Sequence, residues 1–184
     1  MATGVGRKEI TLILGGARSG KSRLAEAIIE QDSRDAVYIA TAQARDDEMS
    51  ARIAAHRARR GAAWRTVEIP LDLARGLSVL VKAENPVLVD CLTLWLSNIL
   101  LADRDAEAEI EALAAAITPA QGKVVLVSNE TGLGIVPDNA LARRFRDLSG
   151  ILNQRMASLA DNVLLVAAGL PLVMKGRNPA DQPV

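Results

Sequence analysis

ITLILGGARSGKS, residues 10–22, is the stretch that decides how this chain folds. An apolar run, residues 10–14, leads directly into residues 15–22, which match the phosphate-binding loop pattern G-x-x-x-x-G-K-[ST] in full. The glycines let the backbone curl so that successive N–H groups point at phosphate oxygens. Lys21 is expected to reach the β- and γ-phosphates, and the Ser22 hydroxyl to ligate Mg²⁺. The stretch predicts a strand, a loop and a helix that bind a nucleoside triphosphate, unless it is a glycine-rich turn that matches by chance.

Short apolar runs recur along the chain, at residues 36–40, 87–89, 124–127 and 163–166. Continuous apolarity indicates strands covered on both faces, as in a parallel sheet. Between the runs, residues 106–117 and 141–159 carry apolar side chains at helical spacing. This alternation predicts an α/β fold with a P-loop NTPase-like, doubly wound and mostly parallel sheet that has helices on both faces.

Bulk composition limits the class of protein. A length of 184 residues suits a single domain, 1–184, with loose ends at 1–9 and 178–184. Basic and acidic residues number 22 each, so no net charge attracts nucleic acid or anionic lipid. The longest apolar stretch, residues 92–102, is too short and too interrupted to span a membrane. The single cysteine, Cys91, is expected to be buried and structural, and the chain to be cytoplasmic.

Ligands of open parallel sheets bind at the carboxyl ends of the strands. Asp90 closes one apolar run, the position of a carboxylate that holds Mg²⁺ in P-loop proteins. The alternative is that Asp90 caps a helix that begins near Leu92. Residues 128–131 follow another run and are candidate substrate contacts, although they do not match the guanine-reading motif of GTPases. Residues 64–69 are an additional candidate edge strand that stops at a proline.

The only histidine, His56, lies in a predicted helix, residues 46–60. Acidic residues occupy the first turn of this helix and arginines its last, as the helix dipole favours. His56 falls on an otherwise apolar face, where a histidine is commonly a hydrogen-bonded core residue. Beside Arg57, Arg59 and Arg60 it is also a candidate nucleophile toward phosphorus, because positive charge stabilises the anionic transition state. The arginines alone would be a solvated face.

Taken in order, these segments resemble the bifunctional adenosylcobinamide kinase / adenosylcobinamide-phosphate guanylyltransferase family of cobalamin biosynthesis. The phosphate-binding loop alone names only a superfamily. The specific part is the order Asp46-Asp47-Glu48-Met49, then His56-Arg57, then Trp64-x-Thr66-x-Glu68. Further matching segments are residues 40–42, 90–93, 127–130, 132–137, 145–147, 152–154 and 168–171. The likeness covers residues 10–175.

The resemblance implies that ATP or GTP phosphorylates the aminopropanol hydroxyl of adenosylcobinamide. GMP is then transferred from GTP to the new phosphate through a guanylylated histidine, with release of pyrophosphate. His56 occupies the position of that histidine, Lys21 is the second catalytic residue, and Ser22 and Asp90 hold Mg²⁺. The implied nucleotide-binding residues are Gly15, Gly16, Ala17, Arg18, Ser19, Gly20, Lys21, Ser22, Ala40, Thr41, Ala42, Arg57, Ala58, Arg59, Arg60, Glu68 and Asp90. The family also forms symmetric homo-oligomers, commonly trimers, and some relatives have Glu at the position of Asp90.

Several alternatives stay open at this level. Glu68 either orients the imidazole or accepts a hydrogen bond from ribose. The chain is alternatively a P-loop kinase of another small alcohol without a covalent step, or a RecA-type ATPase that moves a partner. Both alternatives keep Lys21, Ser22 and Asp90 but need no modified His56. The balanced charge argues against a motor on nucleic acid.

Overall fold

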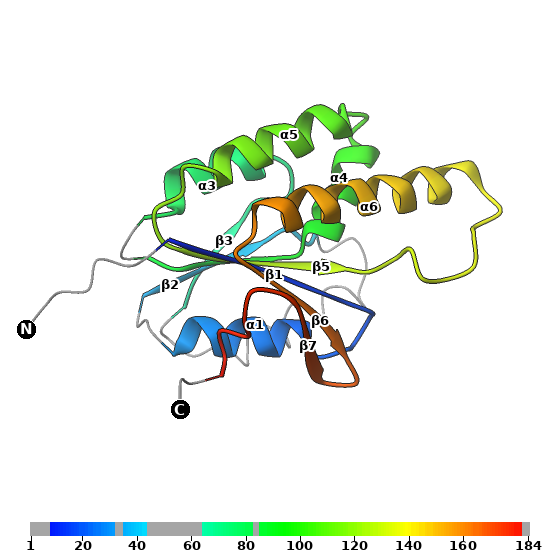
Figure 1. Ribbon diagram of the computed structural model, residues 1–184. Helices are drawn as coiled ribbons and strands as arrows, with labels where there is room; N and C mark the ends of the chain where they lie inside the picture. The colour runs from blue at the N-terminus through cyan, green and yellow to red at the C-terminus, as the bar shows by residue number, and fades with distance from the viewer. Residues whose placement is uncertain (1–7, 32–34, 44–63, 83–84, 182–184) are drawn as a thin grey trace, which may run out of the picture.

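The computed structural model describes residues 8–31, 35–43, 64–82 and 85–181 (Figure 1). The strands are β1 (Glu9–Gly15), β2 (Ala36–Ala40), β3 (Trp64–Glu68), β4 (Val87–Asp90), β5 (Lys123–Asn129), β6 (Asn162–Ala167) and β7 (Leu170–Lys175). The helices are α1 (Lys21–Glu30), α3 (Leu73–Leu80), α4 (Leu92–Leu101), α5 (Ala106–Ile117) and α6 (Ala140–Leu159). The predicted helix at residues 46–60 lies outside the described residues.

The strands form one seven-stranded sheet in the order β3-β2-β4-β5-β1-β6-β7. Every neighbouring pair is parallel except β6 and β7. β1, which leads into the phosphate-binding loop, lies between β5 and β6. The predicted α/β fold with a mostly parallel sheet is therefore confirmed.

Helices cover both faces of the sheet (Figure 1). Successive side chains of a strand point to opposite faces, so each inner strand feeds two hydrophobic clusters. Ile13 joins the cluster under α1, together with Tyr38 and Leu88. Leu12 joins the larger cluster under α3, α4, α5 and α6, which contains the fully buried Trp95. Burial on both faces explains why the strands are continuous apolar runs.

The sequence patterns locate most element boundaries within a few residues. The helix expected at residues 106–117 is α5 (Ala106–Ile117), and the ambiguous run at residues 64–69 is the edge strand β3. The structure adds α3 and β7, which the patterns did not predict. β7 returns antiparallel through a turn in which Ala168 and Gly169 both have positive φ, 51° and 80°. Among the described residues, no helix has both the length and the apolarity to cross a membrane.

Residues near both ends of the described chain make hydrogen bonds within the protein. Glu9 already pairs with Lys123 as the first residue of β1. Asn178 is buried, and its side chain donates to Asp181 at 2.9 Å and accepts from the Ala180 N–H at 3.1 Å. Hydrogen bonds of Asn178 thus fold residues 178–181 into a turn, and the looseness expected of the two ends stays a prediction.

Candidate nucleotide-binding site

The predicted phosphate-binding loop connects the end of β1 to the start of α1. Gly15 has φ 152°, and a Cβ there would lie 2.3 Å from the Val166 carbonyl oxygen. Gly20, the N-cap of α1, has φ 103°, and a Cβ there would lie 3.3 Å from the Gly169 Cα atom. Side chains rarely tolerate such backbone conformations, so glycine is required at both ends of the loop. The mechanical role predicted for these glycines has a direct steric cause.

The β6–β7 turn supports the loop from one side. The Gly169 N–H donates to the Ser19 carbonyl oxygen at 2.9 Å, and Arg18 adopts a left-handed conformation with φ 54°. Gly16, Ala17, Arg18 and Gly20 are exposed to solvent. The loop is therefore held at its base while its tip is open to a ligand. Sequence reasoning missed this support because β7 itself was not predicted.

Lys21 begins α1, and its ammonium group lies at the loop. The residue is 7% exposed, and its ammonium group donates to the Gly16 carbonyl oxygen at 2.6 Å. Burial lowers the pKa of Lys21, while nearby Cys91 and Asp90 act in the opposite direction. A fixed positive charge at this position can stabilise negative charge on a bound triphosphate.

Asp90 ends β4 and lies half-buried at the same edge of the sheet. The Tyr38 hydroxyl donates to Asp90 Oδ2 at 3.0 Å. The helix-cap alternative does not hold, because Cys91 is the N-cap of α4 and no side chain caps that helix. In register, Ala40 lies beside both Asp90 and Glu68. Three residues of the implied nucleotide site thus end three neighbouring strands.

Thr41 connects the ends of β2 and β4. It is fully buried, and its hydroxyl accepts from the Cys91 N–H at 2.9 Å and donates to the Cys91 carbonyl oxygen at 2.7 Å. Its own carbonyl oxygen accepts from the Asn98 amide at 2.8 Å. The polar groups of Thr41 are engaged within the protein, so its evident role is to fix the strand ends that carry Asp90. Ala42 follows in the described loop and is half-buried.

The end of β5 is fixed by a network that sequence reasoning did not find. Ser128 donates to Asn153 at 2.7 Å, and the Asn129 N–H donates to the Thr93 hydroxyl at 2.6 Å. Asn129 pairs in register with Gly15, the first residue of the loop. The network thus positions a polar strand end beside the phosphate-binding loop. Thr93 and Asn153 come from α4 and α6, so a search of strand ends alone passes over them.

Ser22 and Asp90 fit the oxygen donors that Mg²⁺ prefers. Mg²⁺ is usually held by one or two protein groups together with water and phosphate oxygens, so it needs no larger protein cage. Within the described ranges no group of three or more histidine, cysteine or acidic side chains could hold a metal ion. Cys91 is buried as predicted, and burial raises the pKa of its thiol to about 12.

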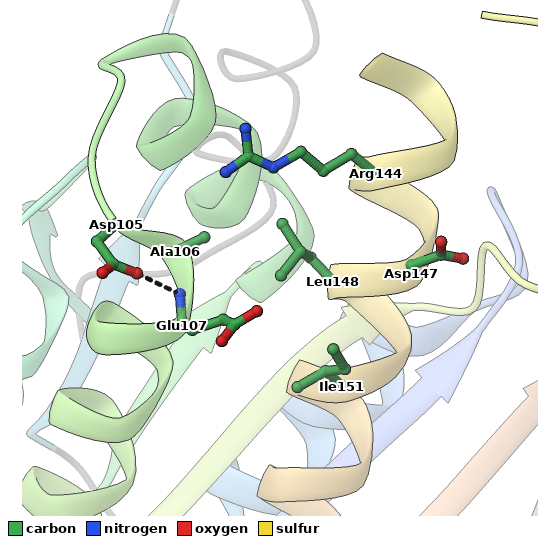
Figure 2. A pocket seen from close by; sticks show the side chains of 7 residues that line it. All are labelled: Asp105, Ala106, Glu107, Arg144, Asp147, Leu148 and Ile151. Carbon is green, nitrogen blue, oxygen red and sulfur yellow. Dashed lines mark hydrogen bonds between the residues drawn. The ribbon is translucent and has the colours of Figure 1, made fainter. Parts of the chain in front are cut away.

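A cavity of about 410 Å³ opens elsewhere, between the first turn of α5 and the middle of α6 (Figure 2). Its lining residues are Asp105, Ala106, Glu107, Arg144, Asp147, Leu148 and Ile151. Asp105 is occupied as the N-cap of α5, where it accepts from the Glu107 N–H at 3.1 Å. None of the predicted site residues lines this cavity.

The structure brings the loop, Ala40, Glu68 and Asp90 to one edge of the sheet but does not place the proposed nucleophile. The remaining predicted residues, His56, Arg57, Ala58, Arg59 and Arg60, lie outside the described residues. Their roles stay predictions.

Comparison with known proteins decides the family. The family model described as cobinamide kinase / cobinamide phosphate guanyltransferase matches residues 11–174. The chain belongs to this family. Its match spans the phosphate-binding loop, the Asp90 strand end and the β6–β7 hairpin that supports the loop.

Two relatives cover nearly the same length as this member of the cobinamide kinase / cobinamide phosphate guanyltransferase family. Bifunctional adenosylcobalamin biosynthesis protein CobP of Pseudomonas aeruginosa is 53% identical over 167 residues, which are 90% of this chain and 96% of the relative. CobU of Salmonella typhimurium, with the same description, is 44% identical over 179 residues, 89% of this chain and 98% of the relative. A solved structure from Pyrococcus horikoshii OT3 shares the fold, with TM-score 0.51, 12% identity and coverage of 94% of this chain and 89% of its own.

Proposed function

We propose that the chain phosphorylates adenosylcobinamide with ATP or GTP and then transfers GMP from GTP to the product, giving adenosylcobinamide-GDP and pyrophosphate. The observation that carries this proposal is the family match over residues 11–174 of a chain with a complete phosphate-binding loop. Adenosylcobinamide and its phosphate are the proposed partners. We also propose that the protein is a homotrimer, because of the family resemblance, and that it is cytoplasmic, because of its composition.

The kinase step is a direct displacement. The aminopropanol hydroxyl oxygen bonds to the γ-phosphorus and gives up its proton to solvent, the bond from γ-phosphorus to the β-phosphate oxygen breaks, and the nucleoside diphosphate leaves. Loop N–H groups and the Lys21 ammonium stabilise the negative charge of the transferred group. Mg²⁺, held by Ser22 and Asp90, would neutralise charge on the phosphates. These residues lie at one edge of the sheet, where the acceptor can approach from solvent.

The transfer step is a double displacement. An imidazole nitrogen of His56 bonds to the α-phosphorus of GTP, and pyrophosphate leaves. A phosphate oxygen of the corrinoid then bonds to the same phosphorus, and the P–N bond breaks to restore the imidazole. Two substitutions by good nucleophiles replace one direct reaction between two anions. Arg57, Arg59 and Arg60 are the proposed partners of the departing pyrophosphate.

The test is incubation with GTP labelled at the α-phosphorus, followed by denaturing electrophoresis. Wild-type protein is expected to keep a covalent label that acid releases, because protonation of the nitrogen makes imidazole a leaving group. His56→Asn should abolish the label and the transferase while it keeps measurable kinase activity. A persistent label in His56→Asn would exclude His56 as nucleophile. An unlabelled wild type would favour a plain kinase or an ATPase.

A further inference from the structure

Tyr38, the only tyrosine of the chain, is directed at the candidate metal ligand. It lies on β2, the neighbour of β4, and the residue is 4% exposed. The hydroxyl is 3.0 Å from Asp90 Oδ2. An ionised carboxylate has only acceptors, so Tyr38 is the donor of this hydrogen bond.

The tyrosine ring is fixed from several sides. Its edge contact with Trp64 is T-shaped, with ring centroids 6.1 Å apart and an interplanar angle of 80°. The Trp64 indole N–H in turn donates to Glu30 at 3.0 Å. Leu88 belongs to the same hydrophobic cluster under α1. The hydroxyl therefore has a defined position relative to the end of β4.

This donor leaves the two carboxylate oxygens of Asp90 in different situations. Oδ2 is engaged by Tyr38, whereas Oδ1 accepts no hydrogen bond from the part of the chain that the structure describes. The terminal torsion of an aspartate side chain is broad, so an isolated Asp90 would sample many orientations. A charge-assisted hydrogen bond selects one of them.

We propose that Tyr38 is a positioning residue for Mg²⁺: it holds Oδ2 of Asp90 so that Oδ1 is left to bind the ion or one of its waters. The inference rests on the proposed function, in which Asp90 is a metal ligand. Thr41 fixes the backbone at the same strand end, and Tyr38 orients the carboxylate itself.

The first test measures Mg²⁺ affinity by calorimetry in the presence of a non-hydrolysable GTP analogue. Partners that orient metal ligands are typically worth 10–100-fold in affinity, so Tyr38→Phe should raise the Kd for Mg²⁺ by roughly tenfold or more. Asp90→Asn should raise it at least as much. The matched control is Trp64→Phe, which alters the ring contact but keeps the Tyr38 hydroxyl, and its Kd should stay within about twofold of the wild type.

Tyr38→Phe should change the Kd for Mg²⁺ far less when it is added to Asp90→Asn than when it is made in the wild-type protein. The reason is that the two side chains act as one unit. In kinase assays Tyr38→Phe should raise the Mg²⁺ concentration needed for half-maximal rate, and saturating Mg²⁺ should restore most of kcat.

A spectroscopic test needs no variant at Tyr38. Tyrosine labelled with a heavy carbon isotope at Cζ gives one resonance, since the chain has one tyrosine. Mg²⁺ added to the nucleotide complex should shift that resonance in wild-type protein but not in Asp90→Asn.

The outcomes separate the two proposals. If Asp90→Asn binds Mg²⁺ as the wild type does, the metal role of Asp90 is wrong and the inference falls with it. If Asp90→Asn weakens Mg²⁺ binding while Tyr38→Phe does not, and the tyrosine resonance does not shift on addition of Mg²⁺, the inference alone is overturned.

Discussion

The two halves of the candidate site are built in different ways. The half on β1 and α1 is made of backbone, and its shape depends on Gly15 and Gly20, where a side chain would meet neighbouring atoms. The half on β2 and β4 is made of side chains, with Tyr38 holding the Asp90 carboxylate and Thr41 joining the two strand ends. Backbone construction leaves a spacing pattern in the sequence. Side-chain construction becomes visible only when the strands are paired.

Gly15→Ala is expected to have the largest effect on stability, because it adds a side chain to the half of the site on β1 and α1 that is made of backbone. The added Cβ would lie 2.3 Å from the Val166 carbonyl oxygen at a φ of 152°. Overpacking of this kind costs about 1–3 kcal/mol, and the strained φ adds to it, so the free energy of unfolding should fall by about 3 kcal/mol. Urea unfolding measures this change.

The control for Gly15→Ala is Gly150→Ala in α6, where a new Cβ meets nothing within 4 Å. Alanine in a helix loses less conformational freedom than glycine, so this variant should be stabilised by about 0.5–1 kcal/mol. Equal effects of the two substitutions would contradict the steric explanation of Gly15.

Thr41→Val tests the side-chain-built half and should have a smaller effect. It keeps the shape of the residue but leaves the buried N–H of Cys91 without its hydroxyl partner, at a cost of about 1–3 kcal/mol in unfolding free energy. Thr41→Ser keeps the hydroxyl and should lose only about 0.8 kcal/mol, the value of one buried methyl group. A change in nucleotide KM without any loss of stability would instead make Thr41 a direct nucleotide contact.

The smallest effect is expected at Cys91, whose thiol should be inert. Burial raises its pKa from the ordinary 9.0 to about 12, so at about pH 9 the folded protein should resist iodoacetamide while the urea-unfolded chain reacts. Because the pKa of the thiol is lower in the unfolded chain than in the folded protein, the unfolded chain loses this proton first as pH rises. The contribution of Cys91 to the free energy of unfolding therefore falls between about pH 9 and pH 12. Comparison with Cys91→Ala over that range isolates the contribution. Rapid alkylation of native protein would contradict the burial.

The fold was largely predictable because burial on both faces gives each inner strand a continuous apolar run. The limits lie at the edge. All six residues of β7 are exposed. Its apolar side chains therefore do not follow the pattern of buried positions that identifies an inner strand. α3 is only eight residues long, too short for a strong periodicity.

The candidate site divides in the same way. Local spacing predicts the loop residue by residue, and the position of Asp90 after an apolar run makes it a candidate metal ligand, a role that stays a prediction. Tyr38 and Thr93 were not predicted, because their roles depend on which strands and helices are neighbours. Sheet order is a long-range property that local spacing does not encode.

The place of β1 in the sheet also affects how the protein is made. β1 finds its two neighbours only in β5 (Lys123–Asn129) and β6 (Asn162–Ala167). Synthesis proceeds from the N-terminus, so the strand that leads into the phosphate-binding loop leaves the ribosome early. It cannot pair with β5 and β6 until those later segments have been made. Pairing over such long separations is slow. The nucleotide site is therefore assembled late in synthesis, and a stalled or truncated nascent chain that ends before β6 carries the loop without the hairpin that supports it.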